Sequence, residues 1–332
     1  MPSKNELSPE IIEKIQLLQE KYSSVGQDLA SYLDGLLYAD FLTYWDYINL
    51  DTLLTLQQPK TPFPDEEIFI IYHQITELYF KLSLNEFGRL RTASKEGPIT
   101  PEFLLERVKR VNRYFEALTN SFDIMVDGMD QKEFLQFRMS LLPASGFQSG
   151  QYRKIEICST SLDQIVHKDL RDKYDNHGVA DIETLAEHLY WREGAIEIKT
   201  GKKTLTLRQF EDKYDAEFLQ LARDVFDCNV RKVANGLEYS SENEHLKDEI
   251  AAAMRWLDVN VNINWPLMHY KSAVRYLQKD VEDIAATGGT NWQKYLPPRF
   301  QKRIFYPELW TEEEIENWGK GWVKREVFNI HE

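Results

Sequence analysis

The sequence predicts an all-α protein: a single large helical domain over residues 1–332, with a small β-hairpin inserted in it. Three observations predict it. Apolar residues recur at helical spacing through most of the chain, helix-start signals precede two of these stretches, and only one stretch alternates as strands do. No internal repeat, low-complexity tract or Pro/Gly-rich linker divides the sequence, so one domain is the simplest organisation.

Two helices are predicted from their start signals. Ser8-Pro9-Glu10 combines a capping hydroxyl, a proline at the first helical position and an acid in the first turn, and Thr100-Pro101-Glu102 repeats this pattern. Apolar residues then fall on one face of each helix. Pro266 should kink or interrupt a third helix, because proline lacks the backbone N–H. The longer helices are predicted over residues 66–92, 207–237 and 245–285.

The β-hairpin is predicted from residues 195–207. Residues 195–199 and 204–207 alternate apolar and polar side chains, and Thr200-Gly201-Lys202 supplies a glycine turn between them. We expect this hairpin to be a surface insertion in the helical body.

Charge and composition exclude several kinds of partner. Acidic residues outnumber basic ones 54 to 40, for a formal net charge of −14, whereas nucleic-acid phosphates are bound by clustered Lys and Arg. No apolar run has the length of a membrane span, and the polar N-terminus lacks a signal-peptide pattern. The two cysteines, Cys158 and Cys228, form no CxxC pair. We therefore expect a cytoplasmic protein with no nucleic-acid and no membrane partner.

Two of the seven histidines lie in apolar, aromatic surroundings. His73 follows Phe69-Ile70-Ile71-Tyr72, and His269 follows Trp265-Pro266-Leu267-Met268. A histidine in such a place is either a hydrogen-bonded core residue or a functional one. The HExxH, paired ExxH, Walker, GxGxxG and GxSxG motifs are absent, which argues against zinc-protease, di-iron, nucleotide and hydrolase sites. One histidine can, however, ligate a haem iron and leave its other face open.

Three polar features also stand out. Arg138 follows Phe134-Leu135-Gln136-Phe137, and a guanidinium in this setting is either part of an internal salt bridge or functional. Pro143-Ala144-Ser145-Gly146 offers backbone donors and close approach at the glycine. Thr287-Gly288-Gly289-Thr290 could surround a small charged group or simply end a helix.

Five motifs, in order along most of the chain, resemble those of the tryptophan 2,3-dioxygenase family. Each motif alone is weak, but the five together are highly specific. The resemblance implies a haem b enzyme that opens the indole ring of L-tryptophan with O2 to give N-formylkynurenine. The motifs are Tyr44-Trp45-Asp46-Tyr47 with Leu50-Asp51 (YxxYLxLD), residues 65–81 (DExLFIIxHQxxELWFK), residues 134–156 (FxxFRxxLxPASGFQSxQFRxxE), Trp265 with His269 (WxxxH) and Thr287-Gly288-Gly289 (TGG).

The same resemblance implies which residues bind the haem. His269 would be the metal ligand on the proximal side of the iron. His73 would be the catalytic residue on the distal side, where it would bond to the indole N–H. The remaining residues of the predicted haem site are Trp265, Gly146 and Arg153.

For the substrate, the resemblance implies an apolar slot with a charged end. Arg138 would hold the carboxylate of L-tryptophan by a bidentate fork. Tyr44 and Tyr47 would reach into the site of a neighbouring subunit, which implies a homotetramer. The remaining substrate-binding residues would be Phe69, Phe134 and Leu141 around the indole ring, and Ser145 and Thr287 near the amino-acid head group or a haem propionate.

Several positions depart from the family's pattern. Pro64 stands where the family often has His, and Trp265-Pro266-Leu267-Met268-His269 replaces WRYNH, which removes a charge and adds a helix breaker. Thr290-Asn291 replaces Ser-Ser after the double glycine. Two alternatives stay open: a related haem oxygenase that acts on another aromatic amino acid or inserts one oxygen atom, and a non-catalytic helical interaction protein without haem.

Overall fold

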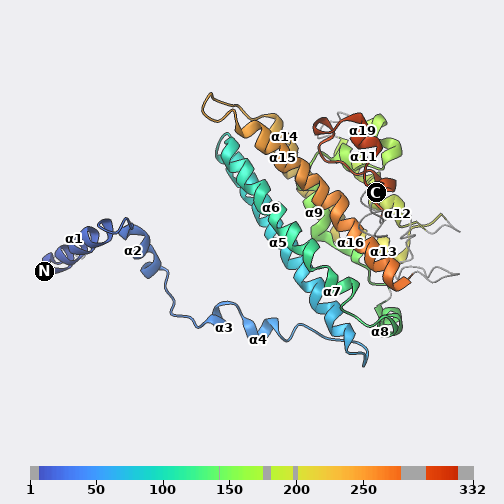
Figure 1. The fold of residues 1–332 in the computed structure, drawn as a ribbon, viewed down its shortest axis with the longest axis horizontal. Coiled ribbons are helices and arrows are strands. Elements are labelled where there is room, and N and C mark those ends of the chain that lie inside the picture. Colours follow the sequence, from blue (N-terminus) through green and yellow to red (C-terminus); the bar gives the residue numbers. More distant parts are fainter. Residues whose placement is uncertain (1–6, 142, 175–180, 197–200, 278–296, 321–332) are drawn as a thin grey trace, which may run out of the picture. The chain divides into compact units, whose positions relative to one another are not determined.

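The computed structural model describes residues 7–141, 143–174, 181–196, 201–277 and 297–320, and most of these residues are helical, with almost no strand (Figure 1). The predicted all-α class is therefore confirmed. The chain forms two compact units, Met1–Gln58 and Pro59–Glu332, which are described separately. In the described part of the chain, no helix combines the length and the apolar character that crossing a membrane requires.

The first unit contains four helices and buries little apolar surface. Ser8, the predicted cap, accepts a hydrogen bond from Ile11 N at the start of the first helix, and Asp28 caps the second. The rings of Tyr22 and Tyr32 stack with centroids 4.4 Å apart, and Leu29 is the one buried apolar residue among residues 7–58. The helices are α1 (Pro9–Ser23), α2 (Leu29–Leu37), α3 (Tyr44–Tyr47) and α4 (Leu50–Leu53).

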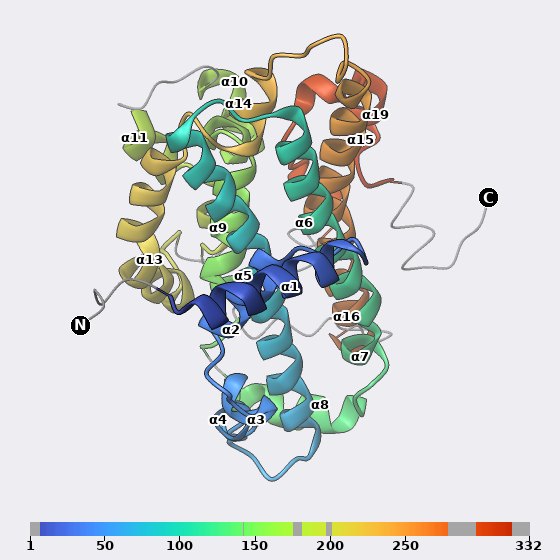
Figure 2. The same cartoon turned by 90° about the vertical axis from the view of Figure 1, so that its left-hand side faces the viewer.

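Five helices that pack in series make the core of the second unit. The predicted start at Thr100 is confirmed, because its hydroxyl accepts from Phe103 N. α5 and α6 form an antiparallel pair (Figure 1), and neighbours pack in the order α13, α9, α5, α6 and α15 (Figure 2). They are α5 (Asp65–Glu96), α6 (Pro101–Ser121), α9 (Gly150–Ser159), α13 (Leu205–Asp224) and α15 (Leu246–Val259).

Further helices surround this core. One of them, α16 (Trp265–Leu277), continues from α15 and packs on α6, α7 and α8. The others are α7 (Asp123–Val126), α8 (Gln131–Phe137), α10 (Arg171–Tyr174), α11 (Ile182–Glu187), α12 (Tyr190–Gly194), α14 (Val230–Asn235), α18 (Pro298–Gln301), α19 (Glu312–Glu316) and the 3-10 turns η1 (Arg138–Leu141), η2 (Gly146–Gln148), η3 (Leu162–Ile165), η4 (Lys168–Leu170) and η7 (Pro307–Leu309).

The predicted β-hairpin is not supported. Its one described pairing is an isolated antiparallel bridge between Ile196 and Lys203, and residues 197–200 lie outside the described residues. The second predicted strand is wrong, because the hydroxyl of Thr204 accepts from Leu207 N and caps α13. A capped first turn satisfies a backbone donor locally, and here it prevails over the alternating pattern.

The predicted helix over residues 207–237 divides into two. α13 ends at Asp224 and α14 begins at Val230, after a turn over residues 225–229. Asn229 explains the break: its Oδ1 accepts from Lys232 N, while its Nδ2 donates to the carbonyls of Val225 and Phe226. One side chain thus ends the first helix and caps the second.

Pro266 interrupts its helix, as predicted. α15 passes into one π-helical turn, η6 (Asn260–Asn264), and α16 begins directly after it. Proline lacks the N–H that would bond to the carbonyl of Asn262, and the single π turn accompanies this interruption of the α-helical hydrogen bonds. The predicted continuation beyond Leu277 to residue 285 lies outside the described residues.

Asp258, at the end of α15, anchors the π turn and the C-terminal segment together. Its fully buried carboxylate accepts hydrogen bonds from the backbone N–H groups of Phe305 and Tyr306, from Trp310 Nε1 and from Asn262 Nδ2. Four donors replace the water that burial removes, which a carboxylate needs in order to remain in the interior.

We expect Asp258→Asn to lower the free energy of unfolding by about 2–4 kcal/mol, because the new NH2 group would face N–H donors that have no other acceptor. Chemical denaturation of the two proteins measures the difference. The exposed Asp248→Asn is the matched control and should change stability by less than about 0.5 kcal/mol. Equal stability of the two variants would show that the Asp258 contacts do not hold the segment.

Candidate functional site

His269 lies on α16 as a half-buried, neutral imidazole. Its Nδ1 bonds to the backbone carbonyl of Trp265 at 3.0 Å, and its ring contacts Trp265 and Phe122, with centroids 4.4 and 4.7 Å away. Burial is the main cause that lowers its pKa to about 4, and the charge of nearby His73 adds to the effect. Because a carbonyl only accepts, Nδ1 carries the proton and Nε2 keeps its lone pair. This is the form in which histidine binds a metal.

His73, on α5, has the same arrangement. Its Nδ1 bonds to the carbonyl of Phe69 at 2.7 Å, and the two rings lie 4.1 Å apart. Burial lowers the pKa of His73, although the hydrogen bond to Phe69 and the charge of Glu77 oppose this. The imidazole therefore stays neutral near pH 7 and offers Nε2 as an acceptor.

The two predicted histidines come from distant parts of the chain to one region. A proton on His73 lowers the pKa of His269, so their rings are within electrostatic reach. Aromatic rings connect their helices: Tyr72 meets Phe122 edge-on at 5.6 Å, and Phe122 contacts His269. The structure therefore has two uncharged imidazoles in one region, among aromatic side chains.

The predicted indole-packing residues Phe69 and Phe134 belong to one cluster of rings. Their centroids are 6.2 Å apart, and Phe137 lies 5.7 Å from Phe69 and 5.5 Å from Phe134. Tyr276 adds a ring 4.7 Å from Phe134. Sequence analysis did not select Phe137 or Tyr276, although Phe137 belongs to the FxxFR motif and Tyr276 lies two helical turns after His269. The predicted Leu141 packs, partly buried, against the same core.

Arg138 follows this cluster directly, at the start of η1, and is only 6% exposed. Burial lowers the pKa of its guanidinium. A guanidinium stays charged even so, because its ordinary pKa lies above 12. The position therefore supplies a positive charge next to an apolar cluster, which suits a ligand with a carboxylate and an aromatic body.

Ser145 and Gly146 form the turn into η2. The Ser145 hydroxyl accepts from Phe147 N, and the Ser145 N–H donates to the Gln148 side chain, which makes a capping box. A Cβ built on the exposed Gly146 would meet no heavy atom within 4 Å. Open space beside this glycine is compatible with the predicted close approach of a ligand.

Arg153, predicted beside the haem, lies in a buried cluster of charges. Its Nη1 donates to Glu156 Oε2 at 3.0 Å and to the Tyr190 hydroxyl, and its guanidinium lies over the Trp191 ring. Arg303 also donates to Glu156. The Arg153 Nε is buried and has no partner among the described residues. A contact with a propionate stays a prediction.

The other three predicted residues do not belong to the described part of the second unit. Tyr44 and Tyr47 lie on α3 in the first unit, 70% and 74% exposed. Thr287 lies outside the described residues. Within the described ranges, no group of three His, Cys, Asp or Glu side chains could hold a metal ion. An iron held by a porphyrin, however, needs just one axial side chain.

The haem-free protein should lose stability as the pH falls from about 6.5 toward 4, because the unfolded chain protonates at His269 while the folded state excludes that proton. The stabilisation that comes from keeping His269 neutral is fully present above pH 6.5, and it amounts to about 3 kcal/mol at most. Asp258, whose pKa burial raises to about 6, acts in the opposite direction over part of this window.

Wild type must therefore be compared with His269→Gln in denaturation curves at several pH values. The variant should lose less stability on acidification, whereas a variant of the exposed His245, His245→Gln, should follow wild type. Parallel pH curves for wild type and His269→Gln would mean that His269 is not held neutral by burial.

Comparison with known proteins places these residues in a family. A family model described as tryptophan 2,3-dioxygenase matches residues 38–255, about two thirds of the chain. A tryptophan 2,3-dioxygenase of Bacillus thuringiensis subsp. konkukian is 28% identical over 81% of this chain and 91% of its own length. One of Pseudomonas fluorescens is 26% identical over 82% and 91%. A Ruegeria relative is 42% identical over 119 residues, 36% of this chain and 42% of its own. The chain belongs to the tryptophan 2,3-dioxygenase family.

Proposed function

We propose that this protein is a haem b-dependent dioxygenase that opens the indole ring of L-tryptophan with O2 and releases N-formylkynurenine. The observation that carries the proposal is the pair of half-buried, neutral imidazoles of His73 and His269, next to aromatic rings and within one helical core. Membership of the tryptophan 2,3-dioxygenase family supports the same reaction.

The residues around His269 fit haem b. A neutral imidazole with its Nδ1–H bonded to a carbonyl is oriented to ligate iron through Nε2, and the rings of Trp265 and Phe122 provide apolar surface for a porphyrin. When bound, haem supplies the iron that activates O2 for insertion into the indole C2–C3 bond. His269 would be its proximal ligand, with Trp265, Gly146 and Arg153 near the macrocycle.

His73 would act on the substrate through its second nitrogen. Nδ1–H already donates to the Phe69 carbonyl, so the neutral ring presents Nε2 as an acceptor for the indole N–H. Protonation would turn this acceptor into a donor, and burial opposes it by lowering the pKa of His73. The residue would thus fix the indole and hold its proton at N1.

The remaining residues would orient the substrate and exclude water. Phe69, Phe134 and Leu141 would enclose the indole ring, and Arg138 would bind the carboxylate with two parallel N–H donors. When both ends of the substrate are held, the reacting groups no longer have to meet by diffusion, which lowers the entropic part of the barrier. Ser145 would bind near the amino-acid head group; Thr287, outside the described residues, keeps the same proposed role.

We further propose that residues 1–332 form one catalytic domain and that the protein assembles as a homotetramer. The exposure of Tyr44 and Tyr47 supports this, since two large aromatic side chains on one short helix are suited to enter the site of a neighbouring subunit. The first unit as a whole buries few of its own apolar residues, which also favours a partner subunit.

The proposal is tested by mass spectrometry after the ferrous, haem-loaded protein is mixed with L-tryptophan and isotopically labelled O2. N-formylkynurenine with two labelled oxygen atoms is expected. His269→Ala should lose the haem absorption, because His269 is the proposed ligand of the iron. His73→Ala should retain the haem and lose activity.

A singly labelled indole product would assign the protein to the related oxygenase instead. A wild-type protein that takes up no haem would favour the non-catalytic alternative. Loss of haem from His73→Ala with retention in His269→Ala would reverse the two roles.

Arg138→Ala should lower kcat/KM for L-tryptophan by about 100-fold or more, the scale expected when a buried charge loses its partner. Tryptamine, which lacks the carboxylate, separates the proposed role from a structural one: its turnover should be the same in wild type and variant. Arg110→Ala is the matched control, because Arg110 is half-exposed and pairs with Glu106. Equal losses for both substrates would show that Arg138 serves the fold alone.

A further inference from the structure

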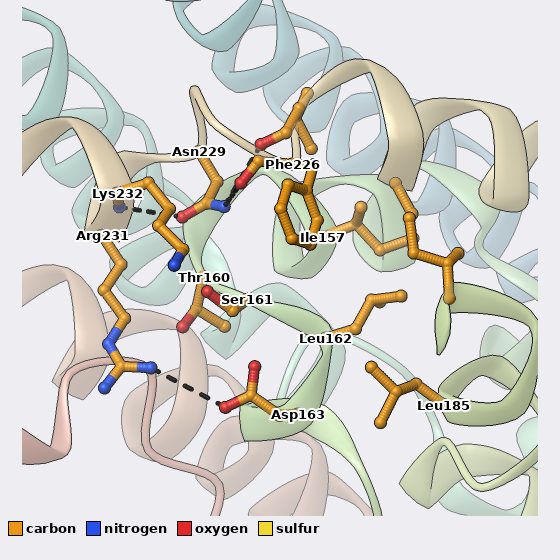
Figure 3. A pocket seen from close by; sticks show the side chains of 13 residues that line it. Ile157, Thr160, Ser161, Leu162, Asp163, Leu185, Phe226, Asn229, Arg231 and Lys232 are labelled. Atoms are coloured by element: carbon orange, nitrogen blue, oxygen red, sulfur yellow. Dashed lines mark hydrogen bonds and ion pairs between the residues drawn. The ribbon is translucent and has the colours of Figure 1, made fainter. Parts of the chain in front are cut away.

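A pocket of about 120 Å³ lies away from the residues assigned above (Figure 3). It is formed by the end of α9, the chain around η3, α11, the end of α13 and the start of α14. None of the predicted haem or substrate residues lines it. Its volume is on the order of the ~150 Å³ cavity that holds one benzene ring.

One wall of the pocket is apolar. Ile157, Leu162, Leu185 and Phe226 present their side chains to the same space in Figure 3. The three aliphatic residues are buried, so this wall is part of the packed core rather than a surface feature. Filling it with an apolar body would remove carbon surface from water without moving the backbone.

The opposite wall is polar, and its charges are not balanced. The Arg231 guanidinium is neutralised by a two-pronged pair with Glu308 and by Asp163, 3.9 Å away. Asp163 also accepts from the Gln164 side chain. Among the described residues, no carboxylate lies within 4.0 Å of the Lys232 ammonium, which lies over the Phe226 ring, 5.9 Å from its centroid. The wall thus carries one uncompensated positive charge.

Hydroxyl groups lie beside this charge. Figure 3 shows the Lys232 amine pointing toward Thr160 and Ser161. Thr160 donates to the Phe305 carbonyl and keeps its lone pairs, while the Ser161 hydroxyl does not cap the 3-10 turn that it precedes. Because the Thr160 proton is already used, the donor set for a carboxylate is the Lys232 ammonium and the Ser161 hydroxyl.

We propose that this pocket binds a small monocarboxylate whose apolar body is about the size of a phenyl ring. The carboxylate would lie against Lys232 and Ser161, and the body against Ile157, Leu162 and Leu185. An organic cation is disfavoured, because the one carboxylate that lines the pocket, Asp163, is already engaged by Arg231. The site is independent of the haem chemistry proposed above.

The test is a titration of the full-length protein with 4-fluorobenzoate, followed by fluorine NMR. Saturable binding is expected for wild type. Lys232→Met should weaken it by about fivefold, the upper range for a partly exposed ion pair, and Lys232→Arg should restore it. Ala222→Leu, which places extra carbon in the pocket, should abolish binding. The exposed Lys247→Met, outside the pocket, is the matched control.

Two further measurements test whether the probe binds in this pocket and whether its carboxylate contributes. Arg138→Ala should bind the probe as wild type does, because binding at the proposed substrate site would be lost in that variant. Fluorobenzyl alcohol, which has the same ring without the charge, should bind more weakly than the acid. Absence of saturable binding, or equal affinity in wild type, Lys232→Met and a folded Ala222→Leu, would overturn the proposal. Lys232 is exposed, so its variants are expected to fold.

Discussion

A single buried carboxylate, that of Asp258, ties the C-terminal segment to the helix that leads to His269. Backbone N–H groups of Phe305 and Tyr306 bond to it from one side, and Asn262 bonds to it from the π turn. Burial raises the pKa of this carboxyl and the hydrogen bonds from its donors oppose the rise, which leaves the pKa at about 6. The direction of α16, and with it the place of the imidazole, depends on this junction.

A second polar anchor holds the π turn from α9. The Tyr152 hydroxyl donates to the Val261 carbonyl at 2.9 Å and accepts from Arg303, which also donates to Glu156. Glu156 in turn binds Arg153. Two arginines pair with one buried glutamate. Removing any of these side chains would leave an unpaired charge in the core, which is strongly destabilising. Arg153 therefore has a structural role whether or not it meets a propionate.

Local signals predicted much of the fold, and long-range contacts account for the rest. Ser8 and Thr100 mark helix starts because capping involves only the first turn, and Pro266 breaks a helix for an equally local reason. The hairpin prediction was wrong because its second strand, despite the alternating pattern, is the start of a helix that the Thr204 hydroxyl caps. The meeting of His73 and His269 could not be read from spacing, since tertiary packing brings α5 and α16 together; the family resemblance supplied it.

The proline at position 266, where the family pattern has arginine, changes the charge near His269 more than the geometry of the helix. The missing N–H would have bonded to the carbonyl of Asn262, upstream of α16, and the π turn accompanies that loss. The carbonyl of Trp265 still bonds to His269 Nδ1, so the tether of the ligand is intact. Pro266, Leu267 and Met268 are buried and apolar, where the family pattern carries an arginine. The difference therefore lies in the electrostatic environment of the imidazole. No arginine at position 266 opposes a positive charge on the ring, and burial is the main cause of its low pKa, with a smaller effect of His73.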